Sequence, residues 1–338
     1  MKLRNEAPIL VVEGNITTDT VLYTVKLTYS GQIAYSDDIP DQYLEKNAKV
    51  TILDNLGDST TLVYTGTQGV YQTTDTTFIG QVGRSYSVKV ELPSGKTFVS
   101  KPELIKPAVP ISSLNIVYDD KFDFNFPTKL KVYADINDPA DQENYYKWDF
   151  TAWTGRQTHG VPCGFGCLIY EYCYQRTISN DINIYADDAV NGNVISNQYM
   201  GQSYIYTYLN HFIEIKQSSI SRDAYLFWQS FKDQTTRTGS ILDPLPASIK
   251  GNIYNQADPE EFALGYFSAS SVTHKKAELI PYSITDYLLK ISAEELIPPG
   301  SVACFQYFPN TLSYDPPPAP QYPPPPGWDT AEQIEVHW

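Results

Sequence analysis

One strong helix signal stands among segments that alternate like β-strands, and this contrast constrains the fold more than any other feature. Ser221 is a suitable N-cap, and Asp223 places a carboxylate at the positive end of the helix dipole. Apolar side chains then follow at the i, i+3, i+4, i+7 spacing of one helix face: Ala224, Phe227, Trp228 and Phe231. The pattern predicts a single helix over about residues 221–237, with its aromatic face in a core.

The rest of the chain has the composition and periodicity of strands. It holds 27 tyrosines and 24 prolines, and only 19% of its residues are charged, which favours half-buried strands joined by rigid loops. Residues 21–29 alternate apolar and polar side chains along one strand. Seven such short segments between residues 8 and 106 predict an immunoglobulin-like β-sandwich, and the fold class is expected to be all-β.

The length of 338 residues leaves room for two cores. Residues 106–110 read KPAVP, a stiff extended linker, because each proline fixes its own φ and biases its predecessor away from helix. We therefore expect a sandwich over 1–106, a linker over 107–112, a larger β-sandwich over 113–308 with the helix inserted, and a tail rich in proline and aromatic residues over 309–338. Within the larger domain, residues 204–220 are predicted to form one long strand that leads into the helix.

Charge and hydropathy limit the partners. A formal net charge of -15 repels polyanions, so neither nucleic acid nor an anionic membrane surface is expected as a ligand. No run of 18 or more apolar residues is present to span a bilayer as a helix. Residues 1–5 form a short polar lead into a strand, typical of a mature form whose signal has been removed, and export is therefore expected.

Four cysteines support export, because an even count in a tyrosine-rich, lysine-poor chain favours disulfides. They are Cys163, Cys167, Cys173 and Cys304. Zinc bound by these cysteines or by His159 is the weaker alternative, since the CxxxCxxxxxC spacing lacks the tight CxxC pairs of structural zinc sites. Three pairings are open, and Cys163 with Cys167 and Cys173 with Cys304 is the one we expect.

The segment DINDPAD, residues 135–141, supplies hard oxygen ligands at close spacing that suit calcium. It lacks the glycine and the terminal glutamate of an EF-hand, and Asp or Asn before Pro139 more often forms a turn through its own side chain. Asp187 and Asp188 form a second acidic pair just before the hairpin signal Asn191–Gly192. We expect turns at both places and no metal or other cofactor, with calcium at DINDPAD left open.

The sequence contains few signals of catalysis. None of the four histidines lies near a nucleophile motif, and neither HExxH, GxSxG nor a phosphate-binding glycine loop is present. The 39 acidic residues include no two that stand out as the carboxylate pair of a glycoside hydrolase. A non-enzymatic role is therefore expected.

Aromatic residues in loops are the candidates for partner contact, because interfaces draw their binding energy from a few ordered aromatic anchors. The tail alternates prolines with aromatics, so parts of it should adopt polyproline II. It is either a disordered stalk or a strap that docks on the parent domain or on a partner, and docking on the parent domain is the one we expect. The candidates are Phe165, Tyr170, Tyr314, Tyr322 and Trp328. An equally open reading places these aromatics in the core of their own domain.

Six blocks in one order carry a resemblance to a known family. They are PILVVEGNITTD, DPADQENYYKWDF, the cysteine and tyrosine pairing around residues 167–174, QSSISRDAYLFWQSFKDQ, GSILDPLPASIKGNI and PEEFALGYFSAS. In these blocks, which span nearly the full chain, the sequence resembles the DUF4249 family, lipoproteins of Bacteroidota. Family members carry a lipoprotein signal with an acylated cysteine just ahead of the LVVEG strand, and they often occur beside genes for TonB-dependent outer-membrane transporters.

The resemblance implies a lipid-anchored outer-membrane protein at the cell surface, with a TonB-dependent transporter or another outer-membrane barrel as its partner. The printed sequence includes neither the signal nor the lipobox cysteine, so the anchor is an expectation from the resemblance alone. We expect an accessory protein that contributes to partner or substrate binding. The alternatives are a surface adhesin that binds glycans or peptides, which predicts a groove lined by exposed Tyr and Trp, and, less favoured, a hydrolase.

Overall fold

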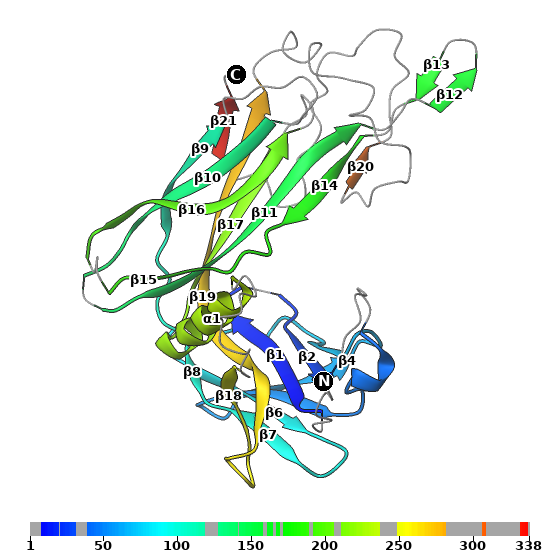
Figure 1. The fold of residues 1–338 in the computed structure, drawn as a ribbon, viewed down its shortest axis with the longest axis vertical. Coiled ribbons are helices and arrows are strands. Elements are labelled where there is room, and N and C mark those ends of the chain that lie inside the picture. Colours follow the sequence, from blue (N-terminus) through cyan, green and yellow to red (C-terminus); the bar gives the residue numbers. More distant parts are fainter. Residues whose placement is uncertain are drawn as a thin grey trace, which may run out of the picture.

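The computed structural model describes residues 8–19, 21–31, 39–118, 128–140, 142–157, 161–164, 167–169, 172–188, 192–205, 211–236, 249–281, 306–308 and 332–336. These residues form two β-rich domains with one α-helix between them (Figure 1). The helix is α1, Arg222–Thr235, as the sequence predicts, and Ser221 caps it by accepting a hydrogen bond from the backbone N–H of Ala224 at 3.1 Å. Within the described part of the chain, no helix is long and apolar enough to cross a membrane.

The first domain is a closed sheet of nine strands in the order β1-β2-β5-β4-β3-β6-β7-β18-β19, closed by a parallel pairing of β1 with β19. The short strand β8, Glu103–Leu104, pairs with β6 beside it. The nine strands are β1 Leu10–Thr17, β2 Thr24–Tyr29, β3 Lys49–Asp54, β4 Ser59–Tyr64, β5 Val70–Thr73, β6 Ser85–Glu91, β7 Thr97–Ser100, β18 Lys250–Asn255 and β19 Phe262–Pro281.

This architecture corrects the expected immunoglobulin-like sandwich over residues 1–106. The strands predicted there exist, but they form one closed barrel, and two strands from residues 250–281 are needed to close it. The barrel core accordingly combines Val12 and Val88 with Ile253 and Phe267. Period-two alternation identifies a strand and its buried face, but it does not say which distant strand lies beside it.

The second domain has two facing sheets, as the sandwich prediction requires. One sheet runs β19-β17-β11-β14-β20, with β15 beside β11 and β21 beside β19; the other runs β16-β10-β9. A core of Leu130, Val132, Trp148, Phe150 and Ile215 lies between them. The strands are β9 Ile111–Tyr118, β10 Thr128–Asn137, β11 Tyr145–Gln157, β14 Tyr172–Ile178, β15 Asn183–Ala186, β16 Val194–Ile205, β17 His211–Ser219, β20 Gln306–Phe308 and β21 Glu332–Val336; β12 Val161–Gly164 and β13 Cys167–Ile169 form a separate hairpin.

The predicted single strand over residues 204–220 is wrong. Tyr204 and Ile205 end β16 in one sheet, whereas His211 begins β17 in the facing sheet. The long strand of this protein is β19, with 20 residues. Its first part, around Leu264–Ser270, closes the barrel against β1, and its second part, Ser271–Leu279, pairs with β17 in the second domain.

The two domains are therefore joined by a continuous hydrogen-bonded strand as well as by the proline linker. Figure 1 shows β19 running from the barrel into the upper sheets, with α1 beside the crossing point. Ile105 belongs to the barrel core and Val109 to the second core, so the chain passes between the cores where the linker was expected. The expected continuous domain over 113–308 differs from the structure, because residues 250–270 return to the barrel.

Candidate ligand-binding cleft

A cleft of about 760 Å³ lies where the barrel, the second domain and α1 meet. Its three walls are the outer face of β1, β2 and β19, the outer face of β11 and β17, and one side of the helix. Binding sites for small molecules commonly measure about 300–1,000 Å³ and lie between domains. The cleft is therefore the candidate functional site of this molecule.

The helix supplies the aromatic wall. Trp228 and Phe231 line the cleft with their ring centroids 6.2 Å apart and their planes nearly edge to face, and Phe231 is 43% exposed. Ala224 and Phe227 lie on the buried side, where Phe227 packs on Tyr266 at 5.0 Å between ring centroids. The aromatic face that the sequence assigned wholly to a core is thus divided, with one half buried and the other half open to the cleft.

The barrel supplies a polar wall. In β1, Val12 and Ile16 point into the core, so Glu13 and Asn15 point outward. Asn15 lies opposite Ser268 of β19, and Glu13 lies opposite Lys26 of β2. Side-chain amide, hydroxyl and charged groups therefore face the helix aromatics across the cleft.

The second domain contributes paired charges from the motif KWDF, residues 147–150. Trp148 points inward and its indole N–H donates to Gln217 at 2.7 Å, so Lys147 and Asp149 point outward into the cleft. Lys147 forms an ion pair with Asp149, and its ammonium lies 5.4 Å from the centre of the Trp228 ring, a cation–π distance. This lysine joins the polar wall to the aromatic wall.

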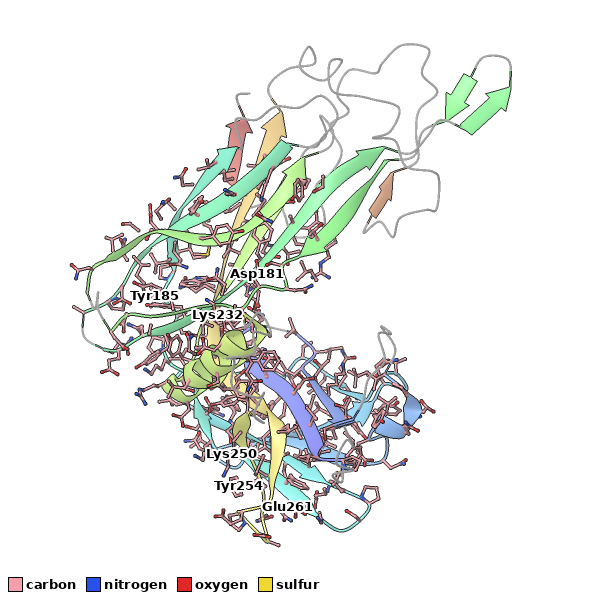
Figure 2. All side chains as sticks on the ribbon, viewed as in Figure 1. Asp181, Tyr185, Lys232, Lys250, Tyr254 and Glu261 are labelled. Atoms are coloured by element: carbon pink, nitrogen blue, oxygen red, sulfur yellow. The ribbon has the colours of Figure 1, made fainter. Side chains whose placement is uncertain are left out.

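A buried carboxylate helps to hold the helix wall against the barrel. Glu103 is 4% exposed, and its Oε1 accepts hydrogen bonds from the Tyr266 hydroxyl at 2.5 Å and the Asn252 amide at 3.2 Å. Burial raises the pKa of Glu103, while hydrogen bonds from Ser221, the helix N-cap, and from Tyr266 act in the opposite direction. In Figure 2 the label Lys232 marks α1, which lies in this view between the second domain, labelled at Tyr185, and the barrel, labelled at Lys250.

An ion-pair network links the two domains beside the cleft. His274 of β19 contacts Glu214 of β17 through Nδ1 at 2.9 Å and Asp19, which follows β1, through Nε2 at 3.2 Å. Lys216, which lines the cleft, pairs with Asp19 at 3.3 Å. The hydrogen bonds to Asp19 and Glu214 raise the pKa of His274 to about 9, so the imidazole is charged at neutral pH.

We expect His274→Gln to lower stability at pH 7 and to change its pH dependence. The pKa of His274 is higher in the folded protein than its ordinary value of 6.5, so its stabilising contribution is complete below pH 6.5 and is lost as the pH rises through about 9. Urea unfolding between pH 6 and pH 10 measures this contribution. The variant and the wild type should converge near pH 10; a constant difference across that range would contradict the assigned charge.

Most candidate residues from the sequence lie outside the part of the chain that the structure describes. The backbones of Cys163, Cys167 and Cys173 lie in β12, β13 and β14, but their side chains and the whole of Cys304 lie outside the described residues. The same is true of the proposed contact side chains Phe165, Tyr170, Tyr314, Tyr322 and Trp328. The disulfides and the aromatic contacts therefore stay predictions.

At DINDPAD the aspartate oxygens join the end of β10 to neighbouring segments, instead of closing a local turn on the adjacent backbone as predicted. Asp135 accepts from Ser113 at 2.9 Å and from the backbone N–H of Asn197 at 2.7 Å. Asp138 accepts from Tyr146 at 2.6 Å and from the backbone N–H of Gly192 at 3.1 Å, while Asp141 lies outside the described residues. In the ranges that are described, no three His, Cys, Asp or Glu side chains come together to hold a metal ion.

Asp138 lies beside Asp187, a member of the second acidic pair noted in the sequence. Asp187 is fully buried, and its Oδ2 accepts from the backbone N–H of Asn144 at 2.8 Å. Burial raises the pKa of Asp187 and the nearby Asp138 carboxylate raises it further, while the hydrogen bond from Asn144 acts in the opposite direction. The two acidic segments thus form one buried polar cluster that holds the ends of β10, β11 and β15 together.

The sequence reasoning missed the residues of the cleft. Lys147, Asp149 and Lys216 alternate with core residues, and this alternation indicates an outward face. Nothing local reveals that the outward face of β11 lies opposite Trp228 or the outward face of β1. That arrangement depends on β19 being shared by both domains.

Comparisons with known proteins place the chain by family. No curated protein matches it. Among solved structures, a Salmonella alpha-2-macroglobulin, the mutant Y1175G, is similar at 11% identity and a TM-score of 0.20, with 64% of this chain and 14% of that chain covered. The family model described as a domain of unknown function, DUF4249, matches residues 1–276. Since this match spans most of the sequence, the chain belongs to the DUF4249 family.

Proposed function

We propose that this protein is a non-enzymatic accessory lipoprotein at the cell surface, anchored in the outer membrane and associated with a TonB-dependent transporter. In this role the cleft holds part of the substrate or of a partner. The observation that carries the binding role is the aromatic wall of exposed Phe231 and half-buried Trp228, opposite a polar wall in a cleft of suitable size. The membrane anchor and the transporter come from the family resemblance.

The connection between the domains supports such a role. A receptor gains affinity when its binding surfaces are held in place before the ligand arrives. Here β19 runs through both domains, Glu103 holds Tyr266, on which Phe227 of the helix packs, and His274 bridges Asp19 and Glu214 across the junction. The cleft is thus built from elements that are fixed relative to one another.

Co-purification tests the accessory role. We expect the full-length lipoprotein, extracted in detergent from its native membrane, to bring an outer-membrane barrel protein with it. Replacing both Phe165 and Tyr170 with serine should weaken that association, because aromatic loop residues are the proposed contacts. Recovery of the lipoprotein without any barrel partner would contradict the proposal, and equal loss of folding and association in the variant would assign the two aromatics to the core.

A surface adhesin for glycans or peptides is the second candidate. The same wall favours it in part: this alternative predicts a groove lined by exposed Tyr and Trp, and the cleft has exposed Phe231 beside half-buried Trp228. The two roles differ in their partner: an adhesin works as an isolated chain, whereas the accessory protein is recovered with a barrel.

A further inference from the structure

We propose that the occupant of the cleft is an oligosaccharide. This inference rests on the proposed binding role and names the chemical class of the ligand.

In the part of the chain that the structure describes, the cleft walls present side chains and no free strand edge. Peptides commonly bind by adding a strand to an exposed sheet edge, where main-chain hydrogen bonds supply affinity. Among the described residues, each of the five strands whose faces line the cleft pairs with a strand on either side. β1 lies between β2 and β19, β2 between β1 and β5, β11 between β17 and the strands β14 and β15, β17 between β11 and β19, and the barrel part of β19 between β1 and β18. An extended peptide would find no backbone partner along these walls.

Side-chain hydroxyl and amide groups are numerous there instead. The outward positions of β1, β2 and β19 in the cleft carry the accessible small polar side chains Asn15, Thr24 and Ser268. Ser218 and Ser270 also line the cleft but are almost fully buried. Such groups both donate and accept hydrogen bonds, which matches the hydroxyl groups of a sugar ring. The Lys147–Asp149 pair adds a donor and an acceptor beside them.

The helix supplies the complementary surface. A pyranose ring has an apolar face of C–H groups, which packs on the faces of aromatic rings. Phe231 is the more accessible platform, at 43% exposed, and Trp228 lies next to it. An oligosaccharide between the walls would place C–H faces against the helix and hydroxyl groups against the barrel and β17.

Binding to oligosaccharide and peptide arrays tests this assignment on the purified full chain. We expect saturable binding to one group of the oligosaccharides on the array and no binding to random peptides. Phe231→Ala should weaken that binding about tenfold or more, by loss of a stacked aromatic anchor. Leu226→Ala is the matched control: Leu226 is also 43% exposed on α1, but it lines only the adjoining smaller cavity and not the cleft, so its replacement should leave binding unchanged.

A second variant guards against misfolding. Asn15 is exposed on β1 and lines the cleft, so Asn15→Trp should fill the cleft while leaving the helix untouched, and it should abolish oligosaccharide binding. If the protein binds peptides and Asn15→Trp blocks that binding, then the cleft is a binding site but its ligand is not an oligosaccharide. Absence of binding to any printed oligosaccharide would overturn the inference, whereas recovery of a barrel partner would still support the accessory role.

Discussion

Gly265→Ala is expected to destabilise the protein by about 3–5 kcal/mol, because a positive φ and a clash with backbone act together at this position. Gly265 has a φ of 85°, in the left-handed region that side chains disfavour. A Cβ there would overlap the carbonyl group of Val12, its partner in the parallel pairing that closes the barrel. A Cβ on Gly251 of β18 would likewise overlap the carbonyl oxygen of Gly265. The strands β1, β18 and β19 therefore approach one another closely at these two glycines.

Urea unfolding followed by tryptophan fluorescence measures this change, with Gly57→Ala as the control. Gly57 also has a positive φ, 97°, but nothing lies within 4 Å of a Cβ placed on it. Its replacement should therefore cost only the backbone conformation, about 1–2 kcal/mol. If the two variants lose the same stability, then close approach of β1, β18 and β19 is not what requires Gly265.

His211→Leu is expected to remove much of the protein's sensitivity to mild acid. His211 is 1% exposed in β17, and neither ring nitrogen has a hydrogen-bond partner in the part of the chain that the structure describes. Burial lowers the pKa of His211 to about 3. The folded protein therefore keeps this imidazole neutral, while the unfolded chain binds a proton near pH 6.5.

The sign of the effect follows from proton uptake. Above pH 6.5 both states are neutral and His211 adds no pH dependence; below it, only the unfolded state gains a proton, and stability falls until the pH approaches about 3. Between pH 7.5 and pH 5 the loss from this residue should be about 2 kcal/mol, at 1.36 kcal/mol for each pH unit below 6.5.

Chemical denaturation at pH 7.5, 6 and 5 tests the assignment. Leucine at 211 leaves no unpaired ring nitrogens in the core, so the variant should be as stable as the wild type or more stable at pH 7.5, and its stability should change less down to pH 5. His274→Gln serves as the comparison, since His274 is charged when folded and its contribution is lost on the alkaline side. An unchanged acid profile in His211→Leu would show that His211 is protonated or solvated in the folded protein.

Local sequence determined the elements. Ser221 and Asp223 predicted where the helix begins because capping and dipole interactions are made within its first turn. Alternation predicted most strands of the barrel for a similar reason, since each strand has one buried face of its own.

Only the tertiary structure decided how these elements are combined. Barrel closure joins β1 to β19, pairing Val11 with Leu264, and loop closure over such a distance has no local signature. The same strand carries His274 into the second sheet and places Asp19 beside it. The cleft follows from this shared strand. Outward residues such as Asn15, Lys147 and Phe231 are ordinary surface residues in the sequence, and they form one site only because β19 fixes their three walls around a common space.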